Sequence, residues 1–147
     1  MEKPVVQIIN RSFNPLPQYA TAGAAGMDIR AHLPAPVTLQ PLERRLIPTG
    51  LYIQLPDGYE AQVRPRSGLA INHGITCLNS PGTVDADYRG ELKVILINLS
   101  NEPHTIQPGD RIAQIIVQQV TQIEWIEVTE ITQTGRGEGG FGHTGRE

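Results

Sequence analysis

The apolar residues of this chain never repeat at the spacing of an α-helix for as long as three turns. They occur in short runs, and some of these alternate apolar and polar side chains, as in residues 27–31 and 59–63. Turn residues stand between the runs, as in Pro56-Asp57-Gly58 and Pro108-Gly109-Asp110. Short strands separated by such turns are typical of β-sandwiches and β-barrels. The sequence therefore predicts an all-β domain.

The same pattern predicts where the elements lie. Residues 64–70 break the alternation and predict a single helical turn. Residues 80–91 carry a polar run between glycines and separate two apolar runs, which predicts a β-hairpin or tight loop. Strands are expected at residues 4–9, 27–31, 37–39, 45–53 with an interruption at Pro48 and Gly50, 59–63, 75–78, 92–99, 111–120 and 123–128.

The chain has the length of one ordinary domain, and its last thirteen residues differ from the rest. Six of residues 135–147 are glycine, and Phe141 is the only large apolar side chain among them. Such a segment buries too little surface to order itself, so we expect a folded domain at 1–134 and a flexible arm at 135–147. The arm is either a disordered terminus or a lid, in which Arg136, Phe141, His143 and Thr144 would contact a ligand.

Charge and hydropathy exclude some classes of protein. The net charge of −3 argues against non-specific binding to nucleic acid or to an anionic membrane. No apolar stretch is long enough to cross a membrane, and the N-terminus has no signal-peptide pattern, so a soluble cytoplasmic protein is expected. Its basic residues are arginine except for Lys3 and Lys93, which suits phosphate or carboxylate ligands. Cys77 lies in an apolar run and is expected to be a buried, unreactive thiol.

The densest polar cluster is Asp85 to Arg89, which holds two aspartates, a tyrosine and an arginine in five residues. Loops that place several functional groups on a rigid support commonly form binding or catalytic sites. The alternative is a solvated loop tip in which Asp85 pairs with Arg89. Four further polar clusters, each next to a glycine, lie at residues 26–31, 65–70, 109–114 and 136–145.

In order and spacing, these five clusters resemble the five motifs of the homotrimeric dUTP pyrophosphatase (dUTPase) family. The resemblance runs from Ala25-Gly26-Met27-Asp28 to the Gly-Gly-Phe-Gly-His-Thr-Gly of the arm. It implies a jelly-roll or distorted β-barrel fold and a homotrimer with active sites between subunits. It also implies hydrolysis of dUTP to dUMP and pyrophosphate, which would limit uracil incorporation into DNA and supply dUMP for dTMP synthesis.

By this resemblance, Asp85 is the general base that aligns a water for attack on the α-phosphorus. Tyr88 would pack under the deoxyribose and exclude a 2′-hydroxyl. Asn79 and the loop backbone next to it, including Val84, would read the uracil edge. A hydrogen-bond mismatch there discriminates between bases more strongly than a difference of one methylene, which changes binding by only ~1–3 kcal/mol.

The other clusters would hold the phosphates and a metal. Arg66, Ser67 and Gly68 resemble the phosphate-contacting loop of the family, and Gln114 is placed to contact the same chain of phosphates. Asp28 resembles the carboxylate that holds Mg²⁺ through bound water, which suits a cation that keeps much of its hydration shell.

In the arm, Arg136 and Thr144 would close on the phosphates, and Phe141 would stack on the uracil. Gly142 and His143 lie between them, and His143 is a departure, because the family more often has serine there.

Several of these residues have structural alternatives. Asp28 could pair with Arg30 on one face of its strand, and Asp87, Arg89, Glu91, Asp110 and Arg111 could mainly support the loop or a subunit interface. A dCTP deaminase shares the expected fold and trimer, but Tyr88, residues 66–70 and the arm resemble the pyrophosphatase. A nucleotide-binding module without catalysis would not need Asp85.

Overall fold

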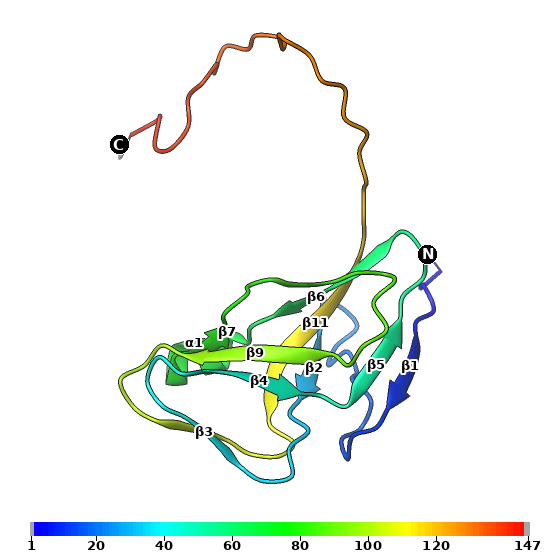
Figure 1. The fold of residues 1–147 in the computed structure, drawn as a ribbon, viewed down its shortest axis with the longest axis vertical. Helices are drawn as coiled ribbons and strands as arrows, with labels where there is room; N and C mark the ends of the chain where they lie inside the picture. The colour runs from blue at the N-terminus through cyan, green and yellow to red at the C-terminus, as the bar shows by residue number, and fades with distance from the viewer. Residues whose placement is uncertain (1, 146–147) are drawn as a thin grey trace.

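A computed structural model describes residues 2–145 of the chain (Figure 1). Within that range the chain forms eleven β-strands and one short helix. The elements are β1 (Gln7–Asn10), β2 (Met27–Arg30), β3 (Val37–Leu39), β4 (Arg44–Pro48), β5 (Leu51–Gln54), β6 (Tyr59–Arg64), α1 (Ser67–His73), β7 (Ile75–Cys77), β8 (Gly82–Val84), β9 (Lys93–Asn98), β10 (His104–Ile106) and β11 (Arg111–Gln119). The predicted all-β class is confirmed.

The strands form small antiparallel sheets. The larger ones have the orders β2-β11-β6-β8 and β4-β9-β7, and β1-β5 and β3-β10 form pairs. In the described range none of these sheets closes into a barrel. The arrangement is that of a distorted, jelly-roll-like β fold.

Strand alternation decides what enters the core. In β9, Val94, Leu96 and Asn98 are buried, whereas the residues between them are partly exposed. The fully buried Asn98 side chain donates hydrogen bonds to the carbonyls of Leu39 (3.0 Å) and Glu102 (2.8 Å). A buried amide without such partners would be costly, so these bonds allow a polar side chain at this depth.

The one cysteine lies in this core as predicted. Cys77 ends β7 and is buried, and desolvation raises the pKa of its thiol to about 11. The thiolate is the reactive form, so Cys77 is unreactive at neutral pH.

The expected helical turn is longer than predicted. Helix α1 has seven residues and ends at Gly74, whose φ of +66° is the left-handed conformation that glycine adopts readily. The strand expected at 45–53 divides into β4 and β5 at the predicted interruption near Pro48 and Gly50, where the chain turns at Thr49 and Gly50. Gly50 has a φ of +71°, and an added Cβ there would lie 2.8 Å from the Ser12 Cβ.

Of the two alternatives predicted for residues 80–91, a β-hairpin or a tight loop, the hairpin is wrong and the loop is found. Strand β8 pairs with β6, and β9 pairs with β4 and β7, so the two flanking strands belong to different sheets. Residues 85–92 therefore form a loop that crosses from one sheet to the other. The local sequence predicts a polar loop between strands but not which partners those strands choose.

The prediction of a strand at 123–128 is also wrong for the isolated chain. No regular element follows β11 in the described range, and the chain arcs away from the body beyond it (Figure 1). Trp125 and Ile126 are 86% and 81% exposed. These apolar residues find no neighbouring strand on their own chain. Among residues 2–145 there is no helix with the length and apolar character needed to cross a membrane.

Candidate active site

The start of α1 places one group of predicted site residues. Pro65 ends the strand conformation, and Arg66 has the extended backbone of a helix N-cap, with φ −97° and ψ 133°. Neither a capping side chain nor an acidic residue satisfies this helix end. Gly68 faces open space, because an added Cβ there would meet no atom within 4 Å. Ser67 and Gly68 thus lie in an uncapped first turn that a ligand can approach.

Asp28 on β2 is the centre of this group. Arg66 Nε donates to Asp28 Oδ1 at 3.0 Å, and Arg111 Nε lies 3.8 Å from Asp28 Oδ2. Arg66 Nη1 also donates to the Arg111 carbonyl at 3.3 Å. Gln114 is the register partner of Asp28 on β11, and its side chain donates to the Pro65 carbonyl at 3.1 Å. We call Asp28, Arg66, Arg111 and Gln114 the Asp28 cluster.

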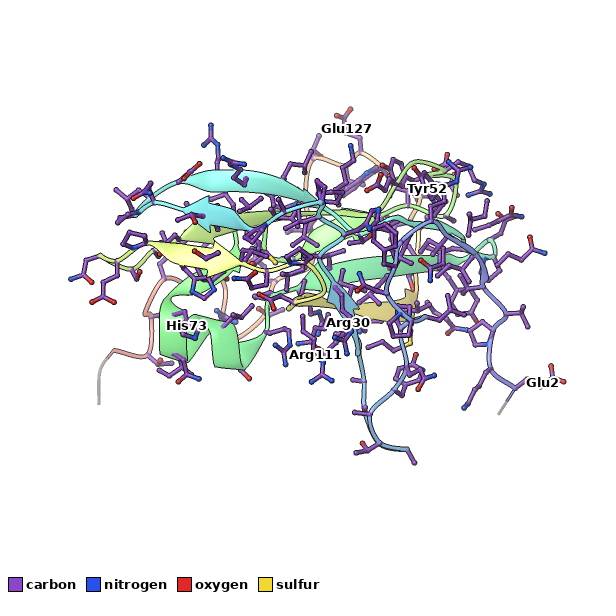
Figure 2. The ribbon with its side chains drawn as sticks, turned by 90° about the horizontal axis from the view of Figure 1, so that it is seen from below. Glu2, Arg30, Tyr52, His73, Arg111 and Glu127 are labelled. Carbon is purple, nitrogen blue, oxygen red and sulfur yellow. The ribbon has the colours of Figure 1, made fainter. Side chains whose placement is uncertain are left out.

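The expected alternative for Asp28 does not occur. Arg30 donates to the Gly109 carbonyl at 3.1 Å, and Asp28 pairs with Arg66 and Arg111. Arg30 and Arg111 are cross-strand partners, and Figure 2 shows them close together near α1. Several arginines and one carboxylate therefore share this surface, and the excess positive charge suits phosphate groups.

Residues 85–91, called the Asp85 loop, form the second group. Asp85 follows the buried Val84 and is exposed, and the Tyr88 N–H donates to its carbonyl at 3.2 Å. Arg89 donates to the carbonyls of Ala86 (2.6 Å) and Tyr88 (3.1 Å). Within residues 2–145 Asp85 and Arg89 form no ion pair, so the alternative of an Asp85–Arg89 pair is wrong, and Arg89 supports the loop backbone.

Asn79 and Val84 flank this loop in different ways. The Asn79 side chain lies close to Gly82, where an added Cβ would be 3.2 Å from Asn79 Nδ2. Val84 is 8% exposed and belongs to the core. A ligand could therefore meet the main chain of Val84 more readily than its side chain.

The two groups lie at opposite ends of β6. Val84 is in register with Ala61 near the middle of β6, so the chain continues from Val84 toward the Tyr59 end, whereas Arg66 follows the other end. At ~3.3 Å per residue, the five residues from Ala61 to Arg66 span roughly 15–20 Å. Among the described residues no hydrogen bond or ion pair joins the groups. One chain thus brings Asp28, Arg66 and Gln114 together, but not with Asp85.

The described part of the arm, residues 135–145, touches neither group. Residues 136–145 form successive turns, with N–H donation from Gly139 to Arg136 O, from His143 to Gly140 O and from Gly145 to Gly142 O. Arg136 Nε donates to the Gly139 carbonyl at 2.5 Å. Phe141 and Thr144 are exposed, and the segment lies away from the body (Figure 1).

A protein-family model matches the sequence that carries these groups. The model of the dUTPase family matches residues 14–145, which include the Asp28 cluster, the Asp85 loop and the described arm. The chain belongs to the dUTPase family. The predicted resemblance is confirmed.

Two curated relatives match nearly the whole of this dUTPase chain. A deoxyuridine 5′-triphosphate nucleotidohydrolase of Fusobacterium nucleatum subsp. nucleatum is 59% identical, over 99% of this chain and 100% of that protein. The protein of the same name from Finegoldia magna is also 59% identical, over 95% of this chain and 98% of that protein.

Solved dUTPase structures share the fold at lower identity. A mutant dUTPase of Staphylococcus bacteriophage 80alpha with dUpNHpp has a TM-score of 0.87 at 24% identity, covering 97% of this chain and 99% of that one. A mutant dUTPase from phage phi11 of S. aureus, described with a structural Mg(II) ion, has a TM-score of 0.78 at 22% identity, covering 86% and 98%. At these identities the likeness supports the fold alone.

The side chains near Asp28 indicate how a metal ion could be held in this dUTPase. In the described part of the chain no three His, Cys, Asp or Glu side chains converge on a possible metal position. Asp28 is a single carboxylate, and its side chain is 39% exposed. Such a donor does not make a protein cage, but it fits a hydrated Mg²⁺ whose other ligands are water and substrate phosphates.

Arg111 is a neighbour of Asp28 that the predicted site residues do not include. Its half-exposed side chain lies beside the Asp28 carboxylate. Its position directly after the Pro108-Gly109-Asp110 turn, at the start of the strand that carries Gln114, is the sequence signal for this placement.

Proposed function

We propose that the protein hydrolyses dUTP to dUMP and pyrophosphate, and thereby limits uracil incorporation into DNA and supplies dUMP for dTMP synthesis. The observation that carries the proposal is the family match over residues 14–145. The named activity of relatives that are 59% identical over nearly the whole chain supports it.

The reaction is an attack of water on the α-phosphorus of dUTP. Asp85 is exposed at the end of β8, where its carboxylate would accept a proton from the water as the new phosphorus–oxygen bond forms. The bond from the α-phosphorus to the oxygen that bridges to the β-phosphorus breaks, and its electron pair leaves with pyrophosphate. No covalent enzyme intermediate is needed.

The Asp85 loop would also select the nucleoside. The Tyr88 ring would pack against the deoxyribose and leave no room for a 2′-hydroxyl. Asn79 and the main chain near Val84 would contact the uracil edge. The absence of a Cβ at Gly82 leaves room for the Asn79 side chain next to this main chain, which supports the proposed placement of Asn79.

The Asp28 cluster would hold the phosphate chain. Arg66 offers a planar set of donors, Ser67 and Gly68 offer the amides of an uncapped helix turn, and Gln114 offers a side-chain amide. Asp28 would face Mg²⁺ through bound water, and the metal, when bound, supplies positive charge that offsets charge on the leaving pyrophosphate.

We further propose that the active sites lie between subunits of a homotrimer. The stretch of β6 between the Asp28 cluster and the Asp85 loop, roughly 15 Å at the rise of a strand, is longer than the triphosphate of one substrate. If one chain supplied the Asp28 cluster and a second chain supplied the Asp85 loop, the two groups could meet around one substrate. The arm of a subunit would then close with Arg136, Gly142, His143 and Thr144 near the phosphates and Phe141 on the uracil.

A product assay tests the function. The protein with Mg²⁺ is given dUTP, dCTP, dTTP or UTP, and pyrophosphate and ammonia are followed separately. Pyrophosphate from dUTP alone is the expected result, and ammonia from dCTP would indicate a deaminase. Binding of dUTP without turnover would indicate a binding module.

A matched pair of variants tests the base. Asp85→Asn is expected to lower kcat by about 10²–10⁴-fold, the usual contribution of a general base, and to keep affinity for the non-hydrolysable analogue dUpNHpp. Asp87→Asn makes the same charge change two residues away and is expected to cost far less. Near-normal turnover in Asp85→Asn would remove Asp85 from the mechanism.

A further inference from the structure

Glu91, the last residue of the Asp85 loop, forms hydrogen bonds through both its main chain and its side chain. Its carbonyl accepts the Tyr88 hydroxyl at 2.8 Å. One carboxylate oxygen accepts the Gly50 N–H at 3.3 Å, and the other accepts the Tyr52 hydroxyl at 3.4 Å. The Glu91 side chain is partly exposed, so its hydrogen bonds are partly shielded from water.

The chain next to Glu91 is fixed to the same β4–β5 turn. The Leu92 N–H donates to the Leu51 carbonyl at 2.8 Å, and the Leu92 carbonyl accepts the Thr49 hydroxyl at 2.6 Å. The main chain is thus held by Thr49 and Leu51, and the Glu91 carboxylate by Gly50 and Tyr52. The end of the Asp85 loop is bound to this turn through side chain and backbone together.

Tyr52 is itself held from the N-terminal segment. The Arg11 guanidinium carbon lies 4.7 Å from the centre of the Tyr52 ring, and the Arg11 N–H donates to the Gly50 carbonyl at 2.8 Å. A cation over an aromatic face is attracted to the ring. The contacts Arg11–Tyr52–Glu91 therefore connect the segment after β1 with the loop that carries Tyr88.

The Tyr88 ring depends on this support because it folds back over Gly90. An added Cβ at Gly90 would lie 2.4 Å from the Tyr88 hydroxyl oxygen, so the ring, Gly90 and the Glu91 carbonyl form a close-packed unit. Tyr88 is still 44% exposed, so packing alone leaves one side of its ring free. The hydrogen bond to Glu91 fixes the remaining freedom of the hydroxyl end.

We propose that Glu91 is a positioning residue that orients Tyr88 through the contacts of its carboxylate with Gly50 and Tyr52, and thereby sets the selection of deoxyribose over ribose. This inference rests on the proposed function, in which Tyr88 excludes the 2′-hydroxyl. In this role Glu91 acts through Tyr88 and needs no contact of its own with the substrate. A ring that is held rejects a 2′-hydroxyl by steric overlap, whereas a ring that can shift admits it.

The expected signature is therefore a change in specificity with less change in turnover. A purely structural role would lower kcat/KM for dUTP and UTP by the same factor. Loss of a positioning role raises the ratio of kcat/KM for UTP to that for dUTP. A hydrogen bond to a charged group typically stabilises by enough free energy to change an equilibrium about tenfold or more. The two bonds of the Glu91 carboxylate are long, so we expect its loss to raise the UTP/dUTP ratio about tenfold.

The experiment compares the full-length wild type with Glu91→Ala, Glu91→Gln and Tyr52→Phe. Each is assayed for kcat and KM on dUTP and UTP with Mg²⁺, and folding is checked by circular dichroism. Glu91→Ala is expected to raise the UTP/dUTP ratio about tenfold, with kcat on dUTP changed by less than that. Glu91→Gln keeps an acceptor oxygen and is expected to restore part of the selectivity.

The chain offers a matched control. Glu43 also accepts a backbone N–H, from Gln40 at 2.8 Å, and a side-chain donor, Arg45 Nε at 3.2 Å, but it lies before β4, outside both site groups. Glu43→Ala is expected to leave the ratio unchanged. If Glu91→Ala does not fold, Tyr52→Phe decides, because it removes one hydroxyl and keeps both the ring and the carboxylate.

Two failures can be told apart. A wild-type ratio in Glu91→Ala, or in Tyr52→Phe where Glu91→Ala does not fold, overturns the positioning role of Glu91 and leaves dUTP hydrolysis intact. A wild type that releases no pyrophosphate from dUTP overturns the proposed function, and the inference with it.

Discussion

Asp28 and Arg66 lie 38 positions apart in the chain, and Asp28 Oδ1 accepts a hydrogen bond from Arg66 Nε at 3.0 Å. The carboxylate sits on β2 and the guanidinium at the start of α1, so one ion pair joins the proposed metal-facing residue to the proposed phosphate-binding residue. Both side chains are partly exposed. The pair is therefore accessible to substrate.

Asp28→Asn separates the two roles of this pair. Exposed ion pairs contribute only ~0–1 kcal/mol, so the melting temperature should change little. We expect activity to fall and to need more Mg²⁺, because a neutral amide holds a hydrated cation less well. A Mg²⁺ titration of the initial rate measures this. An unchanged Mg²⁺ dependence would remove Asp28 from the metal site.

Mixing two inactive variants tests whether sites are shared. Asp85→Asn and Arg66→Ala should each lose most activity alone. If each site takes Asp85 from one chain and Arg66 from another, random 1:1 trimers should recover about a quarter of the sites. The variants are unfolded and refolded together, and dUTP turnover is compared with each variant refolded alone. No recovery, with mixed trimers confirmed by mass, would place each site within one chain.

Truncation after Thr134 tests the arm. The described residues of this segment, 135–145, lie away from the body (Figure 1), so the fold and melting temperature should be preserved. Activity should fall, because the proposed contacts of Arg136 and Phe141 would be lost. Phe141→Ala in the full chain is the narrower test and should raise KM. Full activity of the truncated protein would show that the arm has no role in turnover.

His104 should make stability depend on pH. Burial, and next the neighbouring His73, whose ring centre is 4.6 Å away, lower the pKa of His104 below its ordinary 6.5, while Asp110 opposes this. As pH falls through about 6.5 the unfolded chain takes up the proton first, so stability decreases toward acid and rises with pH.

The control is His104→Phe, which keeps a ring beside His73 and removes the titration. Melting temperatures between about pH 5 and pH 8 should vary less in this variant than in the wild type. Equal slopes in the two proteins would contradict the role of His104.

Local pattern predicts some elements well. The alternation in 59–63 and the turn before Arg111 predict β6 and β11, because each strand's own residues decide which face is buried. Partner choice is not local. The local pattern allows either a hairpin or a tight loop between the runs that flank the Asp85 loop, and the runs pair in different sheets, since other strands offer them buried partners.

The same limit applies to the site. Asp28 and Arg30 share a strand, and their spacing suggests an ion pair, yet Asp28 meets arginines from α1 and β11. The contact of Glu91 with Tyr52 joins residues 39 positions apart and could not be found from spacing. Residue types and order within the five clusters did predict the family, which the family model and relatives confirm.

The exposed apolar segment after β11 has a spectroscopic consequence. Trp125 is the only tryptophan of the chain, and it lies in that segment at 86% exposure. An indole in water emits at longer wavelength than one packed among apolar side chains. All tryptophan fluorescence of this protein therefore comes from one reporter in the segment between β11 and the arm. A blue shift with rising protein concentration would follow chain association, and one on nucleotide addition would follow movement of the arm, with no label attached.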